Sequence, residues 1–190
     1  SNYWYDLLTG GFYPETYPDA DSVYAMHYYN ADEPAFRKLL LGCADGHIRF
    51  MDDTAKDDDT GSLAAPASTP IDSWVLMGPI RISGNYDYNA ILNSLTFITA
   101  GGGFGGSLAD TDALDWAVYV DETAEGVIEK LDAGQMPLGG TMNVPGRSFQ
   151  KRFRARGVFA GVRVGNAAQG ETWGIERVTG QVLPAGRARR

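Results

Sequence analysis

Cys43 and His47 are the residues of this sequence whose types could support nucleophilic catalysis. A thiol becomes a good nucleophile when a neighbouring base takes its proton, and a third group then orients that base. The two residues flank Asp45-Gly46, so the spacing places them on opposite arms of a tight turn, with no evident third group. Because cysteine is also a common buried residue, we interpret Cys43 as a structural strand residue. No catalytic residue is therefore expected.

Metal ligands are a second kind of chemistry that the residue types allow. With 1 Cys and 2 His, a zinc site would need carboxylates to complete it, and the spacing matches no zinc pattern. Calcium prefers clustered oxygen ligands, and the acid-rich segment 52–61 offers Asp53, Asp57 and Asp59 as candidates. This segment lacks the register and closing glutamate of a calcium-binding helix-loop-helix, so an exposed acidic loop is the favoured interpretation. No cofactor is expected.

The glycine-rich segment 101–106 formally matches the dinucleotide-binding fingerprint and follows a predicted strand. A phosphate-binding loop of that type must open a helix whose N-terminus faces the phosphates. The residues that follow, 114–119, have a strand-like pattern instead. A flexible hairpin loop is therefore favoured over nucleotide binding.

Charge is divided sharply along the chain. Residues 1–140 carry 22 acidic and 6 basic side chains, whereas residues 141–190 carry 2 acidic and 10 basic ones. Alternation places Arg152, Arg154 and Arg156 on one face of a predicted strand. Three more arginines, Arg187, Arg189 and Arg190, lie at the end of the sequence, and all six are candidate interface residues. We predict that carboxylates of this chain or of a neighbouring copy match them. Nucleic acid is the alternative partner, although a pI near 4.7 disfavours it.

These candidates must be positioned by strands. Composition, with 24 glycines and 12% aromatic residues, predicts an all-β, mostly antiparallel fold with one short helix. The segment 37–52 reads as strand, turn, strand, with Asp45-Gly46 predicting a type I′ hairpin. Together with strands in 3–18 and 22–29, this hairpin predicts one four-stranded, blade-like sheet over residues 1–60. Residues 61–70 are predicted to be a linker, within an exposed loop that spans 52–70.

Residues 71–190 are predicted to form a β-sandwich or jelly-roll-like domain. The expected strands are 71–82 (bent at Gly78-Pro79), 92–99, 114–120, 150–164 and 171–183. One helix is predicted near 122–133, capped by Asp121 and ended by Gly134. Its buried stripe has helical spacing and consists of Ala124, Val127, Ile128 and Leu131. No apolar run approaches the roughly 20 residues of a membrane span, so no span is predicted.

The abundant tyrosines and tryptophans allow two interpretations. Exposed, coplanar rings such as those of Trp4, Trp116 and Trp173 could form a sugar-binding platform on a β-sandwich. The same residues also suit β-cores and subunit interfaces, because a rigid ring buries much area for little loss of rotamer entropy.

Three segments together resemble a known class of proteins. They are Trp4–Pro14, the hairpin segment Leu40–Arg49 (Leu-Leu-Gly-Cys-Ala-Asp-Gly-His-Ile-Arg), and Trp173–Arg177 followed by Pro184–Arg187. They look like the C-terminal portion of tailed-bacteriophage virion proteins of the tail, neck or hub type, in which blades with a Leu-Gly-x-x-Asp-Gly hairpin precede a terminal β-domain. The chain holds at most one blade, so it cannot close a propeller by itself.

The resemblance implies a role rather than a reaction. Such proteins carry no catalytic residues to transfer, so the expected function is a non-enzymatic structural component located in a virion. The expected partners are other virion proteins and further copies of this chain. Carbohydrate binding during adsorption to a host surface is the alternative function.

Overall fold

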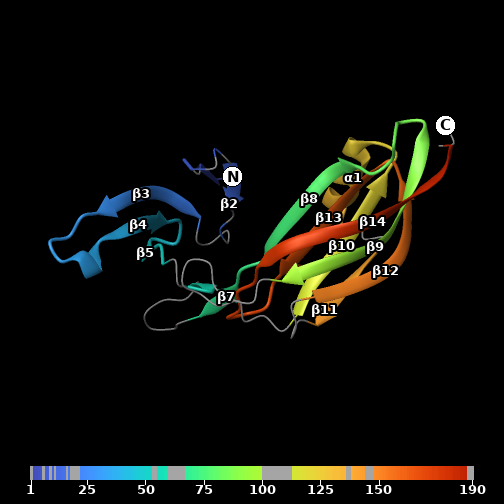
Figure 1. Cartoon of the computed structure of the whole chain (residues 1–190). Coiled ribbons are helices and arrows are strands. Elements are labelled where there is room, and N and C mark those ends of the chain that lie inside the picture. The colour runs from blue at the N-terminus through green and yellow to red at the C-terminus, as the bar shows by residue number, and fades with distance from the viewer. Residues whose placement is uncertain are drawn as a thin grey trace. The chain divides into compact units, whose positions relative to one another are not determined.

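The computed structural model describes residues 2–5, 7–8, 10, 12–15, 17, 22–52, 55–59, 67–99, 113–135, 138–143 and 148–187. Within these residues the chain forms antiparallel strands, one α-helix and a 3-10 turn at Pro34–Phe36 (Figure 1). The prediction of a mostly antiparallel all-β fold with one short helix is confirmed. The chain divides into two compact units, Ser1–Thr69 and Pro70–Arg190. This division falls at the end of the predicted linker.

The strands of the N-terminal unit do not form the predicted single sheet. β1 (Asn2–Tyr5) and β2 (Phe12–Glu15) pair only with each other, while β3 (Val23–Tyr29), β4 (Lys38–Cys43) and β5 (Ile48–Phe50) form a separate sheet in the order β3-β4-β5. The prediction of one four-stranded sheet is therefore wrong for the described residues. Pro14 in β2 has no N–H to donate, which limits this strand to an edge position.

The segment 52–70, predicted to be a loop and linker, contains two short strands. β6 (Asp57–Asp59) and β7 (Ser68–Pro70) form a two-stranded sheet. The Ser68 hydroxyl donates a hydrogen bond to Asp57 Oδ2 at 3.0 Å. The sequence shows no period-2 pattern there, because neither strand presents an apolar face that would generate one.

The hairpin between β4 and β5 is present, but its turn is not the predicted type I′. Gly46 has a φ of 83°, whereas no described residue other than glycine has a positive φ, so Asp45 cannot occupy the first central position of that turn. Gly46 N–H donates to the Cys43 carbonyl at 3.1 Å, and Cys43 N–H donates to the His47 carbonyl at 3.0 Å. The loop is therefore three residues long, Ala44 to Gly46, with glycine in the left-handed position.

The C-terminal unit contains two antiparallel sheets that share a core. The four-stranded sheet has the order β11-β10-β13-β8, and the three-stranded sheet has the order β12-β9-β14. Their bounds are β8 (Ser73–Arg81), β9 (Tyr88–Thr99), β10 (Ala113–Asp121), β11 (Leu138–Asn143), β12 (Ser148–Gly157), β13 (Phe159–Asn166) and β14 (Ile175–Arg187). The core between the sheets is centred on Phe97, Leu114, Val118 and Val164, which are fully buried. A β-sandwich is thus observed where one was predicted.

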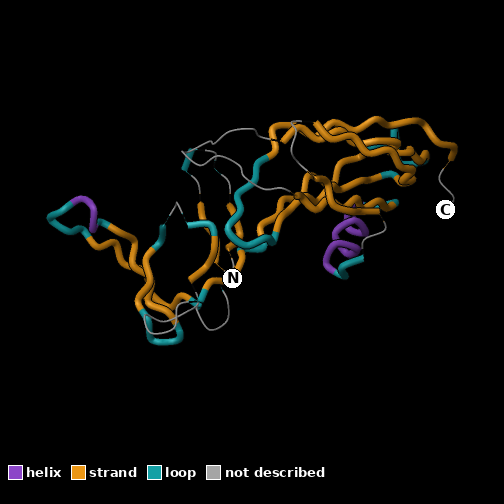
Figure 2. Tube along the Cα trace, turned by 90° about the horizontal axis from the view of Figure 1, so that it is seen from below, coloured by secondary structure: helices purple, strands orange, loops and turns teal. Residues whose placement is uncertain are grey.

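Helix α1 (Ala124–Asp132) covers the outer face of the four-stranded sheet (Figure 2). Val127 and Leu131 pack against Ala117 and Tyr119 of β10. The unit therefore has three layers: helix, four-stranded sheet and three-stranded sheet. The outer face of the three-stranded sheet lies on the opposite side of the unit from the helix.

The N-terminal end of α1 differs from the prediction, whereas its C-terminal end agrees with it. Thr123, not Asp121, is the N-cap, and its side-chain oxygen accepts a hydrogen bond from Gly126 N–H at 3.0 Å. Asp121 instead forms an ion pair with Lys130 at 2.6 Å. Gly134, with a φ of 63°, ends the helix as predicted.

The predicted strand 150–164 is two strands in different sheets. β12 belongs to the three-stranded sheet, β13 belongs to the four-stranded sheet, and the chain crosses between them at Val158. Val158 N–H donates to the Asp121 carbonyl at 2.9 Å. A Cβ on Gly157 would lie 2.9 Å from that same carbonyl oxygen, so the corner requires glycine.

Candidate functional site: an arginine face on the sandwich

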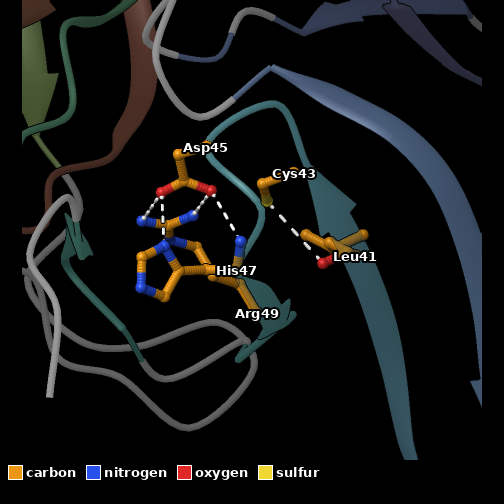
Figure 3. A network of polar contacts seen from close by, with 5 residues as sticks. All are labelled: Leu41, Cys43, Asp45, His47 and Arg49. Atoms are coloured by element: carbon orange, nitrogen blue, oxygen red, sulfur yellow. Dashed lines mark hydrogen bonds and ion pairs between the residues drawn. The ribbon is translucent and has the colours of Figure 1, made fainter.

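The β4–β5 hairpin brings together the residues that suggested nucleophilic chemistry (Figure 3). Asp45 is the centre of this network. Its carboxylate accepts two hydrogen bonds from the Arg49 guanidinium, at 2.8 and 3.0 Å, and one from His47 N–H at 3.0 Å. His47 Nδ1 lies 3.0 Å from Asp45 Oδ2. Asp45 therefore orients the imidazole, and the expectation that no third group would do so is wrong.

The thiol of Cys43 does not take part in this network. Cys43 is buried, and its Sγ donates to the Leu41 carbonyl at 3.6 Å on its own strand. Figure 3 shows the sulfur directed toward Leu41 while the imidazole lies against Asp45. The described geometry therefore fits the structural role that the sequence favoured for Cys43, whereas the role of Asp45 in holding the turn was not predicted.

The Asp45 network makes a testable prediction about acid. The hydrogen bonds from Arg49, followed by that from His47 N–H, hold the pKa of Asp45 well below its usual value of 3.8. A lowered folded-state pKa contributes stability above the unfolded-state pKa, and that contribution is lost only as the pH falls through the folded-state value. We expect the Asp45 carboxyl, followed by NMR, to remain mostly ionised at about pH 3, where an aspartate with the usual pKa of 3.8 would be mostly protonated.

The matched variant is Arg49→Met, which keeps much of the aliphatic stem and removes the guanidinium. In this variant the Asp45 midpoint should rise toward 3.8, because the main cause of the shift is gone. A wild-type midpoint already at about 3.8 would show that the bidentate contact does not form in solution.

The calcium candidates are only partly within the described residues. Asp53 lies outside them, and of Asp59 only the backbone is described. Asp57 accepts a hydrogen bond from Ser68, as noted above. Among the side chains that the structure describes, no group of three or more His, Cys, Asp or Glu residues is arranged to hold a metal ion. The glycine-rich segment 101–106 also lies outside the described residues.

The alternating arginines lie on one outer face, as their spacing predicted. Arg152, Arg154 and Arg156 of β12 are exposed, while Phe153 packs against the core and Ala155 is buried. The pairing of β12 with β9 is irregular between Arg152 and Ala155. Arg152 pairs with Ser94 and Ala155 pairs with Leu92, so β12 has one more residue than β9 between these two pairs. An extra residue of this kind increases the local twist of the strand, while the regular alternation of β12 keeps the three arginine side chains exposed.

Cross-strand pairing extends this surface over the whole three-stranded sheet. Residues directly opposite one another share a face, so the side chains beside the arginines follow from the register. One row across β12, β9 and β14 consists of Arg152, Ser94 and Gln181. A second row across the same strands consists of Arg156, Ile91 and Leu183. Ile98 is opposite Arg177, which is exposed. We call the surface formed by Arg152, Arg154, Arg156 and Arg177 the arginine face.

Within the described part of the chain, no carboxylate lies at ion-pair distance from any of the four arginines. Glu176 precedes Arg177 in β14 but has an interaction of its own. The predicted matching of these arginines by carboxylates is therefore not made inside the described residues. Matching by a neighbouring copy stays a prediction.

Arg177 is the member of this face that sequence reasoning missed. Its strand was predicted, but only the register with β9 shows that it shares a face with the β12 arginines. The remaining predicted interface residues are the tail. Arg187 ends β14 opposite Tyr88, with its side chain not described, and Arg189 and Arg190 lie outside the described residues.

Charge is distributed unevenly between the two units. Residues 70–190 contain 12 acidic and 12 basic side chains and are neutral, whereas residues 1–69 contain 12 acidic and 4 basic ones, a net charge of −8. The C-terminal unit is therefore neutral as a whole but polarised, because its arginine face carries positive charge that is not paired locally.

The tryptophans of the sandwich are used mainly in its interior. Trp116 is buried and stacks on Phe153, with ring centroids 5.8 Å apart. Trp173 packs against the core and donates from Nε1 to Ser73 Oγ at 2.7 Å. The side chain of Trp4 lies outside the described residues. The exposed Trp74 is covered on one side by the Arg163 guanidinium, 5.1 Å from its ring centroid.

Two further findings bear on the class of protein. Among the described residues, no helix is long and apolar enough to cross a membrane. No family model matches the chain, and no curated protein matches its sequence.

Proposed function

We propose that this chain is a non-enzymatic structural component of a tailed-phage virion, of the tail, neck or hub, that acts through contacts between subunits. The observation that carries the proposal is the arginine face. Four exposed arginines lie on one face of the sheet without described carboxylates to pair them, and three of them, Arg152, Arg154 and Arg156, place like charges close together along one strand. That arrangement is unfavourable in an isolated subunit and becomes favourable when an acidic surface covers it.

Two other features support an assembly role. The three segments that resemble virion proteins lie in both units, and the hairpin among them folds as a rigid turn held by Asp45. β3 also presents large apolar side chains to solvent: Tyr24 is 82% exposed and Tyr28 58% exposed. Exposed apolar surface on a sheet edge is typical of residues that are covered in an assembly.

Carbohydrate binding is the second candidate, and the exposed tyrosines of β3 are the observation that favours it. A sugar platform requires several rings on one face. Register places Tyr28 beside Leu39 and Tyr29 beside Lys38, so consecutive tyrosines of this strand point to opposite faces. Alternation leaves at most Tyr24 and Tyr28 together on one face of β3, which supports a covered interface better than a platform of several rings. Binding of the purified chain to a glycan array at micromolar strength would reverse the ranking.

Electron microscopy of the purified chain at low ionic strength tests the proposed function. We expect regular multimers, rings or short filaments, because a surface that binds a different surface of the next copy repeats the same contact. A particle that stays one subunit in size, together with a hydrolase activity that is lost on Cys43→Ser, would contradict the proposal.

A further inference from the structure

We propose that the arginine face of one copy binds the exposed acidic stripe of helix α1 of a second copy. This inference rests on the proposed function and names the surfaces that make the subunit contact. The acidic stripe consists of Glu125, Glu129 and Asp132, all exposed, on the side of α1 away from the buried Val127.

The spacing of the stripe is that of one helical face. Glu125, Glu129 and Asp132 are separated by four and three residues, which places them one above another along the helix. No described side chain forms an ion pair with any of them. Lys130, the basic residue in the last turn, is already bound to Asp121 at 2.6 Å and to the Val120 carbonyl at 2.7 Å. The stripe is therefore available to an external cation.

The dimensions of the two surfaces are compatible. Alternate residues of a strand are about 6.6 Å apart, so Arg152 to Arg156 covers about 13 Å. In a helix the rise is about 1.5 Å per residue, so Glu125 to Asp132 covers about 10 Å. Arginine side chains are long enough to absorb the difference, and each guanidinium can bind a carboxylate through two hydrogen bonds.

Helix α1 covers the four-stranded sheet of the C-terminal unit (Figure 2). The arginines lie on the outer face of the three-stranded sheet, so the two surfaces lie on opposite sides of the unit. One unit therefore cannot satisfy its own arginine face with its own helix. Pairing between copies is head to tail, which closes into a ring or extends into a filament. The neutrality of residues 70–190 agrees with such repeated pairing, since each contact matches charges already present in the unit.

Two neutralised variants test this pairing. The sheet variant carries Arg152→Gln, Arg154→Gln and Arg156→Gln, and the helix variant carries Glu125→Gln, Glu129→Gln and Asp132→Asn. Each keeps one intact surface, so each alone should self-associate more weakly than wild type by on the order of tenfold or more. Mixed together, they should form a 1:1 complex of two 20.5 kDa chains, measured by light scattering at low salt.

Arg81→Gln is the matched control, because it removes an exposed positive charge from β8, in the other sheet. It should self-associate like wild type, and circular dichroism should be the same for all four proteins. If the helix variant self-associates as strongly as wild type, this inference is overturned but the proposed function stands. A wild-type chain that never associates would overturn both.

A binding experiment with duplex DNA distinguishes nucleic acid from a second copy of the chain as the partner of the arginine face. If the arginine face binds phosphates, a short duplex should bind wild type and the helix variant equally, and binding should fall steeply with salt. That result, together with a failure of the two variants to form a 1:1 complex, would assign the face to nucleic acid and overturn the pairing with α1.

Discussion

We expect that replacing Arg152, Arg154 and Arg156 together by glutamate strongly weakens the proposed self-association of this chain and leaves it folded. The substitutions place an acidic surface against the acidic surface that the arginines bind in the proposed assembly. Juxtaposed like charges cost on the order of several kcal/mol, so association should weaken by on the order of a thousandfold. The three side chains are exposed on the outer face of β12, so the core is not altered.

Sedimentation velocity gives the mass of the triple variant, and urea unfolding gives its stability. Substitutions at exposed positions of this kind usually change the free energy of unfolding by less than about 0.5 kcal/mol each. Arg81→Glu on β8 is the control, because it makes the same kind of charge reversal at one exposed arginine of another surface. If the triple variant assembles as wild type does, the docking role of β12 is wrong.

Phe97→Ala has the largest expected effect on stability. Phe97 is 0% exposed in the central strand of the three-stranded sheet, with its ring centroid 6.3 Å from that of Trp116 and 6.2 Å from that of Phe149. Truncation leaves a cavity between the sheets and should lower the free energy of unfolding by about 3–5 kcal/mol. The whole stability of a domain is about 5–15 kcal/mol, so much of it would be lost.

Ile98→Ala is the matched control, since Ile98 is the next residue of β9 and points to the outer face, opposite Arg177. It should cost about 1 kcal/mol or less, because a partly buried side chain on the outer face of the sheet leaves no enclosed cavity. Equal losses for the two variants in urea unfolding would mean that the two sheets do not enclose Phe97 as described.

The sequence predicts the fold class and most strands of the C-terminal unit because their patterns are local. Phe97 and Leu95 alternate with Thr96, and Val127 and Leu131 have helical spacing, so each segment reveals its own buried face. β11 was missed because Gly139 and Gly140 interrupt its pattern. The division of 150–164 into β12 and β13 was missed because it depends on the contact of Val158 with Asp121, which is distant in sequence.

The candidate site was predictable in part for the same reason. Alternation within one strand places Arg152, Arg154 and Arg156 on one face, and the structure agrees. Arg177 joins them only through pairing of β12 and β14 with β9, which no local pattern encodes. The orientation of His47 by Asp45 was missed because it depends on a three-residue loop, whereas the Asp-Gly pair suggested a two-residue turn.

The most direct test of the assembly role is the mass of the full chain at two salt concentrations. At about 0.05 M salt, light scattering should give a multiple of 20.5 kDa, and at about 0.5 M the mass should fall toward that of one chain, because salt screens exposed ion pairs. Circular dichroism should stay unchanged, since the apolar core is not screened. A mass of one chain at both salt concentrations, even in concentrated protein, would contradict the account.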